Sequence, residues 1–204
     1  MKLNRKMIIS ILVIAVLGLS SFVAWNQLFG PPNEVAVFET SMGTIEIQLD
    51  RQKAPITVEN FVKYVKTSYY DGTVFHRVMP GFVIQGGGYT TTAEKVAGAP
   101  IKLESNNGLK NLAGTIAMAR TDDPDSATSQ FFINLVDNSD LDYSTTYSGY
   151  AVFGKVVAGM SVVNSIAAVK TGTRYIFFPS YNQTIPFPDW PIQDVVVTKA
   201  YMKP

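Results

Sequence analysis

The 204-residue chain contains no cysteine and a single histidine, and these two scarcities exclude much of enzyme chemistry. Without cysteine there can be no disulfide, thiolate metal site, iron–sulfur cluster, cysteine nucleophile or lipid-attachment cysteine. His76 could serve a Ser-His-Asp hydrolase only beside a serine, and the sequence has no Gly-x-Ser-x-Gly motif. A zinc site would need His76 and carboxylates alone, which is rare. We therefore expect no metal and no other cofactor.

The chain also lacks an excess of positive charge. Seventeen lysines and arginines stand against sixteen acidic residues, for a net charge of +1. Such a chain has no basic surplus with which to hold a phosphate backbone, so nucleic acid is not an expected partner. With 47% hydrophobic and only 16% charged residues, the composition is that of a globular protein. The length fits one domain and a short appendage.

The N-terminal segment has the pattern of an export signal. Lys2, Arg5 and Lys6 precede residues 7–25, which carry no charge and are mostly aliphatic. These nineteen residues are also long enough to form a helix across a bilayer of about 30 Å. A cleaved signal peptide and a retained hydrophobic helix both remain open. We expect a signal or anchor at 1–25, a linker at 26–33 and a folded domain at 34–204.

The hydrophobic pattern of the body alternates in the manner of β-strands, with only two helical segments. A helix is predicted to begin near Pro55 and to end before Asp71, and a second is predicted at 160–169. Many short strands with few helices predict a barrel or a sandwich. The expected strands are 35–40, 44–49, 74–78, 82–85, 115–119, 130–135, 151–156 and 194–200.

Two longer motifs are more specific than these patterns. Residues 75–87 read FHRVMPGFVIQGG and residues 129–134 read SQFFIN. Both motifs, in this order, resemble the signature segments of the cyclophilins, the peptidyl-prolyl cis-trans isomerases. The resemblance extends over about 35–200 and is closest to the bacterial periplasmic subtype, as segments 100–104, 114–121 and 149–156 indicate. It implies a mainly β fold, an eight-stranded closed antiparallel β-barrel capped by two α-helices. Together with the N-terminal pattern, it leads us to expect the protein in the periplasm, soluble or tethered to the inner membrane by residues 7–25.

The chemistry of this reaction agrees with the residues that the chain has. Rotation about a peptide bond that precedes proline breaks no covalent bond, so it needs no nucleophile, metal or proton donor. It is helped by an apolar seat for the proline ring and by a fixed donor that stabilises the twisted amide. Arginine keeps its charge and presents a rigid fork of donors. We therefore expect Arg77 to be the electrostatic catalyst.

The resemblance also implies roles for the other site residues. Gln85 and Phe82 join Arg77 as the catalytic residues. The residues implied to bind substrate are Val83, Ala119, Arg120, Gln130, Phe132, Leu141 and Tyr150. Taken singly, the aromatic residues and Leu141 could instead be ordinary core, and it is their occurrence within the motifs that favours a site. The expected function is isomerisation that assists the folding of exported proteins, and the alternative is a cyclophilin-like chaperone or binding module with little turnover.

Some positions depart from the family pattern. Val83 replaces the usual methionine, Asp140 replaces an aromatic residue, and Tyr150 stands where eukaryotic members have histidine. We therefore expect weak cyclosporin binding. The expected partners are proline-containing polypeptides, with membrane contact only through the N-terminal segment and a monomeric domain. Residues 171–191 are rich in aromatic residues and proline, and could be a packed loop or an extra peptide-contact surface.

Overall fold

The computed structural model of the chain describes residues 34–178 and 182–204. The predicted N-terminal helix, the export signal and the linker at 26–33 lie outside these residues. Among the residues described, no helix has both the length and the apolar character needed to cross a membrane. Apart from residues 179–181, the described part covers the expected folded domain.

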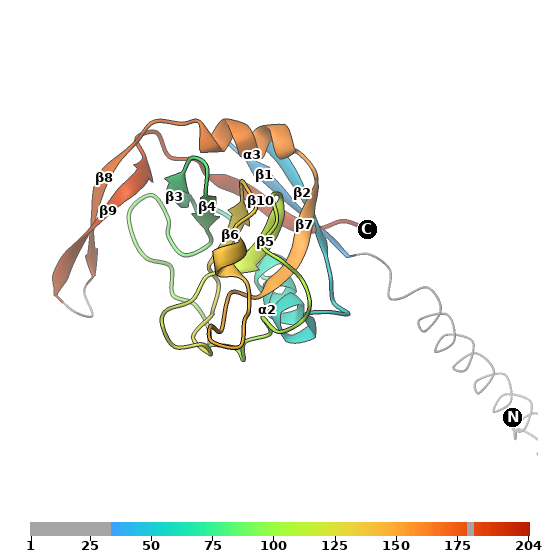
Figure 1. Cartoon of the computed structure of the whole chain (residues 1–204). Helices are drawn as coiled ribbons and strands as arrows, with labels where there is room; N and C mark the ends of the chain where they lie inside the picture. Colours follow the sequence, from blue (N-terminus) through green and yellow to red (C-terminus); the bar gives the residue numbers. More distant parts are fainter. Residues whose placement is uncertain (1–33, 179–181) are drawn as a thin grey trace, which may run out of the picture. The chain divides into compact units, whose positions relative to one another are not determined.

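A single antiparallel sheet of eight strands forms the body of the domain and curls around its core (Figure 1). The order across the sheet is β10-β1-β2-β7-β5-β6-β4-β3. Its strands, in chain order, are β1 (Val35–Thr40), β2 (Gly43–Leu49), β3 (Phe75–Met79), β4 (Val83–Gly86), β5 (Thr115–Met118), β6 (Phe131–Asn134), β7 (Val152–Ala158) and β10 (Val197–Met202). Each of these strands overlaps a strand that the sequence predicts.

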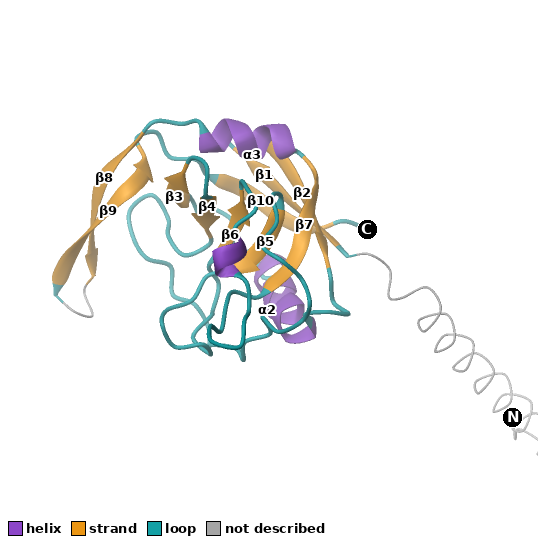
Figure 2. Cartoon of the chain, viewed as in Figure 1, coloured by secondary structure: helices purple, strands orange, loops and turns teal. Residues whose placement is uncertain are grey.

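Two α-helices lie at opposite ends of the curled sheet (Figure 2). Helix α2 (Pro55–Lys66) begins at a proline, which suits the first turn because that turn has no acceptor for its N–H. The Glu104 carboxylate accepts hydrogen bonds from the free N–H groups of Ile56 and Thr57, at 3.1 and 2.7 Å. Both α2 and α3 (Met160–Ala167) bury apolar side chains in the main core inside the sheet. The two predicted helices are thus confirmed.

The prediction of a closed barrel is wrong. Strands β3 and β10 end the sheet, and within the described residues they approach only at the isolated bridge between Val74 and Val196 and the hydrogen bonds around it. The rest of β3 lies beside β9 (Gln183–Pro191), which pairs with β8 (Thr171–Phe178) in a separate hairpin. Within the described residues the eight-stranded sheet therefore ends at β3, with the hairpin beside it (Figure 1).

Residues 171–178 and 183–191 therefore form the two strands of a hairpin, where the sequence analysis left open a packed loop or an extra peptide-contact surface. Its inner face packs a second small core against β3 and the segment after β4. That core contains Val74, Tyr89, Ile176, Phe178 and Trp190, with Phe187 and Val196 at its border. Ordinary packing is thus confirmed for this face. On the other face, Tyr175 and Phe177 are exposed.

Candidate functional site

A tight turn between β3 and β4 sets the geometry of the site. The Phe82 N–H donates to the Met79 carbonyl at 3.0 Å, and Pro80 and Gly81 occupy the two central positions. Gly81 has a φ of 76°, which is the conformation that the third residue of a type II turn requires. The turn fixes the register of the hairpin, so that Arg77 lies directly opposite Gln85.

The same register continues across two further strands. Gln85 pairs with Phe132 on β6, and Phe132 pairs with Ala117 on β5. Since paired residues of neighbouring strands share a face, Arg77 and Phe132 project from the same side of the sheet. The alternate residues of these strands point into the main core; they are Val78, Ile84, Ile133 and Ile116. The row that contains Arg77 therefore lies on the outer face of the sheet.

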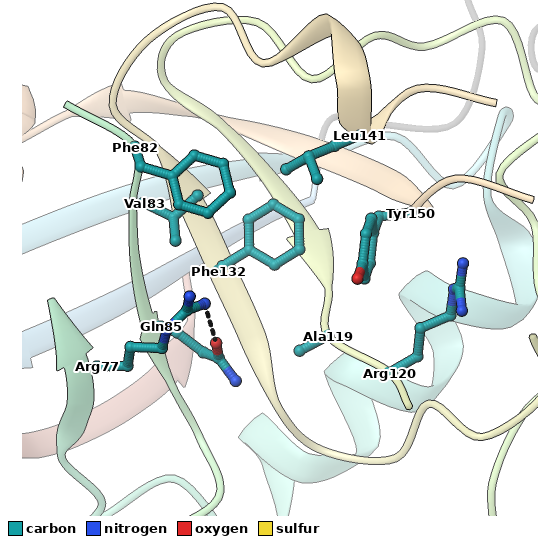
Figure 3. A pocket seen from close by; sticks show the side chains of 9 residues that line it. All are labelled: Arg77, Phe82, Val83, Gln85, Ala119, Arg120, Phe132, Leu141 and Tyr150. Carbon is teal, nitrogen blue, oxygen red and sulfur yellow. Dashed lines mark hydrogen bonds between the residues drawn. The ribbon is translucent and has the colours of Figure 1, made fainter. Parts of the chain in front are cut away.

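On this outer face lies a cavity of about 300 Å³. Its lining residues are Arg77, Phe82, Val83, Gln85, Ala119, Arg120, Phe132, Leu141 and Tyr150. Figure 3 shows the side chains of Phe82, Phe132 and Leu141 side by side, with Arg77 and Gln85 reaching towards one end of this apolar row. Nine of the ten site residues that the sequence predicts are thus brought together.

Arg77 combines fixed position with free donors. Its Nη1 donates to Gln85 Oε1 at 3.4 Å, and its guanidinium carbon lies 6.0 Å from the centre of the Phe82 ring. Its Nε lies 3.9 Å from an oxygen of Asp189 on β9. Nη2 makes no hydrogen bond to any described residue, and the side chain is 40% exposed. The arginine can therefore donate to a ligand without losing the contacts that hold it.

Gln130 does not line the cavity, although the sequence predicts it there. Its Oε1 accepts a hydrogen bond of 2.9 Å from Gln85 Nε2. Because Gln85 in turn accepts from Arg77, Gln130 fixes the direction in which the Gln85 amide points. It stands one hydrogen bond away from the cavity.

Asp140, where an aromatic residue was expected by resemblance, lies exposed on the 3-10 helix Ser139–Leu141 and is also absent from the cavity wall.

Asparagines that the sequence analysis did not single out hold the cavity walls. Asn138 Nδ2 donates to the Phe82 carbonyl at 3.1 Å, and Asn111 Nδ2 donates to the Leu141 carbonyl at 3.1 Å. Buried Asn134 connects the two, since it donates to Asn111 and accepts from Asn138. A buried amide must be hydrogen-bonded, and here the network fixes two loops on opposite sides of the cavity. Only Asn134 belongs to one of the two motifs, so the sequence offered little to indicate this asparagine network.

The opposite rim of the cavity is formed by Tyr150 and Arg120. The Tyr150 ring meets Phe132 edge to face, with 5.5 Å between the ring centres, and the Arg120 guanidinium lies 4.8 Å from the Tyr150 ring centre. Arg120 Nε also donates to the Gly149 carbonyl at 3.0 Å. These contacts direct the charge of Arg120 away from the apolar wall, so Arg77 and Arg120 stand at opposite ends of the cavity (Figure 3).

His76, the one imidazole, does not belong to the site. It lies at the irregularity that interrupts β3 between Phe75 and Arg77, and its ring packs beside the second core, 4.6 Å from that of Tyr89 and 5.9 Å from that of Trp190. Burial lowers the pKa of His76 to about 3. The ring is therefore neutral in the folded protein near neutral pH, where it packs among the aromatic rings of the second core.

Comparison with known proteins agrees with this geometry. The sequence profile of the family described as cyclophilin type peptidyl-prolyl cis-trans isomerase/CLD matches residues 35–201. A peptidyl-prolyl cis-trans isomerase of Acinetobacter baylyi is 58% identical over 142 residues, which cover 69% of this chain and 76% of the relative. Peptidyl-prolyl cis-trans isomerase B of Escherichia coli is 46% identical over 169 residues, which cover 81% of this chain and all of the relative.

The fold has a solved counterpart as well. The crystal structure of a cyclophilin type peptidyl-prolyl cis-trans isomerase from Cryptosporidium parvum superposes with a TM-score of 0.68 and 22% sequence identity, covering 84% of this chain and 98% of that one. This likeness shows that the curled sheet and its two helices are the cyclophilin fold. The chain therefore belongs to the cyclophilin family of peptidyl-prolyl cis-trans isomerases, and it is an enzyme of that class.

Proposed function

We propose that the cavity on the outer face of the sheet is the active site, with Arg77 as the catalytic donor. The observation that carries this proposal is the row of paired residues that places a cation, fixed by Gln85, at one end of an apolar wall. In the transition state the amide loses its resonance and its nitrogen gains a localised lone pair. A guanidinium that is already in place stabilises this charge without reorganisation.

The remaining residues divide between seating the proline and holding the backbone. Phe82, Phe132 and Leu141 form the apolar seat, with Val83 beneath them and Tyr150 at the rim. Gln85, oriented by Gln130, holds the substrate backbone beside Arg77. Ala119 and Arg120 follow β5 directly and pair with the main chain of the bound polypeptide. An apolar seat excludes water, which strengthens the electrostatic contribution of Arg77.

Truncation of the seat tests this division. In Leu141→Ala, the proline ring loses contact with roughly two to three carbon groups of the side chain. Each group is worth about 0.8 kcal/mol when it is fully buried, and we expect about half of that to be lost here because the ring covers it only in part. We expect KM for a short Ala-Pro-Phe peptide to rise by roughly four- to eightfold, with kcat nearly unchanged, because the seat binds ground state and transition state alike. Val157→Ala, which truncates an exposed side chain on β7, is the matched control. Equal KM values for both variants would remove Leu141 from the seat.

We further propose that the enzyme is of the bacterial periplasmic subtype and acts as a monomer on exported proline-containing polypeptides. Support comes from the sequence, because Lys2, Arg5 and Lys6 precede the uncharged residues 7–25. Uncatalysed isomerisation takes about 10–100 s at 25 °C, which is slow enough to limit the folding of an exported chain. The proposal leaves the domain at 34–204 either released or tethered by residues 7–25.

Cell fractionation tests the proposed location. The full chain, expressed in a Gram-negative host, is expected in the periplasmic or inner-membrane fraction, and a variant without residues 1–25 is expected to stay in the cytoplasm. The mass of the recovered protein distinguishes a cleaved signal from a retained anchor. Recovery of the full chain, uncleaved, from the cytoplasmic fraction would contradict the proposal.

A further inference from the structure

The hairpin of β8 and β9 brings a carboxylate next to the proposed catalytic arginine. Asp189 Oδ2 lies 3.9 Å from Arg77 Nε, whereas Gln85 accepts its hydrogen bond from a different nitrogen of the guanidinium, Nη1. The Asp189 side chain is 34% exposed, so a bound polypeptide can approach it. No other described residue makes an ion pair with it. Asp189 is therefore a partly exposed negative charge at the edge of the cavity.

The position of Asp189 is fixed by its neighbours on β9. Trp190 is 1% exposed, and its Nε1 donates to Asp194 at 2.8 Å. Arg174 on β8 forms an ion pair with Asp194 at 2.8 Å and lies 4.9 Å from the Trp190 ring centre. On the other side, the Phe187 ring packs 5.1 Å from that of Tyr89. Buried anchors on both sides hold the backbone of Asp189 beside β3.

The charge of Asp189 changes what the cavity edge attracts. Arg77 alone would make this end of the cavity positive, and would favour acidic side chains in the bound polypeptide while repelling basic ones. A carboxylate at 3.9 Å largely cancels that field for a charge several ångströms away. We infer that Asp189 is a specificity-determining residue, which admits substrates with lysine or arginine beside the proline and disfavours those with aspartate or glutamate.

This inference rests on the proposed function, since it takes the polypeptide to bind beside Arg77. The size of the expected effect on affinity follows from Coulomb's law. A charge about 7 Å from Asp189 in a water-exposed setting changes the affinity by about threefold. The effects on a basic and on an acidic substrate have opposite signs, so the ratio of the two rates should change by about tenfold.

Peptide isomerisation by the Asp189→Asn variant tests the inference. The peptides carry lysine, alanine or glutamate immediately before the proline, and a second set carries them immediately after it. In at least one set, the ratio of kcat/KM for the glutamate peptide to that for the lysine peptide should rise about tenfold over the unaltered enzyme. The change should shrink in 0.5 M NaCl, because both charges are exposed to solvent. Glu39→Gln removes the same charge from β1 and should leave the ratio unchanged.

Two results would overturn the inference. The ratio could stay the same in both peptide sets, or all peptides could lose activity equally, which would show that Asp189 only supports the structure of the hairpin. Arg77→Ala, assayed on the alanine peptide, separates this failure from that of the proposed function. Near-normal turnover by Arg77→Ala would refute the role of Arg77. If Arg77→Ala loses turnover while Asp189→Asn keeps the unaltered glutamate-to-lysine ratio, only the role of Asp189 is refuted.

Discussion

Replacement of Arg77 by alanine is expected to lower kcat/KM for an Ala-Pro-Phe peptide by about 10²-fold or more, because removal of one preorganised donor commonly has an effect of this size. The loss should fall on kcat, since the donor acts on charge that develops only as the amide twists. The fold should remain intact. Arg77 is 40% exposed, its contact with Asp189 is long at 3.9 Å, and exposed ion pairs contribute little to stability.

Two further variants make this result specific. Arg77→Lys keeps the charge but loses the rigid fork, so its turnover should lie between those of the unaltered enzyme and Arg77→Ala. Lys155→Ala removes an exposed cation from β7 and should not change turnover. Thermal melts followed by circular dichroism would show whether each variant is folded. A folded Arg77→Ala protein with near-normal turnover would refute the assignment.

Acidification is expected to destabilise the fold through His76. Burial lowers the pKa of His76 to about 3 from an ordinary value of 6.5. Between these two values the unfolded chain binds a proton that the folded protein does not, so the free energy of unfolding falls as the pH falls. From pH 7 to pH 5 the contribution of this one group amounts to about 2 kcal/mol, and below about pH 3 the dependence ceases.

Urea unfolding at pH 7, 6 and 5 would measure this dependence, with His76→Phe as the comparison. Phenylalanine has a similar ring, suits the aromatic surroundings of Tyr89 and Trp190, and does not titrate. The carboxylates contribute equally to both proteins, so the difference in slope isolates the histidine. The variant should lose about 2 kcal/mol less than the unaltered protein over this range. Parallel slopes would mean that His76 binds protons equally in the folded and unfolded states, so that folding does not shift its pKa.

The strands and helices of the body could be predicted because their hydrophobic periods are local. In β6, Phe131 and Ile133 face the main core, while Phe132 between them faces the cavity. This strand therefore reads as continuously apolar, and only the two motifs indicated that one of its faces forms a site. The cavity residues were predicted through the motifs, and their roles remain predictions that the variants above test.

The hairpin of β8 and β9 and its consequences could not be predicted in this way. Pro186 and Pro188 cannot donate hydrogen bonds, and such residues argue against a central strand. They are tolerated here because a two-stranded ribbon has outer edges that need no partner. The contact of Asp189 with Arg77 joins residues far apart in sequence and depends on how Trp190 is buried.

The most direct test of the account is a crystal structure of the domain, residues 34–204, with a bound Ala-Pro dipeptide or a longer proline-containing peptide. We predict the proline ring against Phe132 and Leu141, with a peptide oxygen within about 3.2 Å of the Arg77 guanidinium. The domain has a second, more open hollow between α2 and residues 98–101. A proline ring bound in that hollow, with the outer face of β4 and β6 empty, would contradict the account.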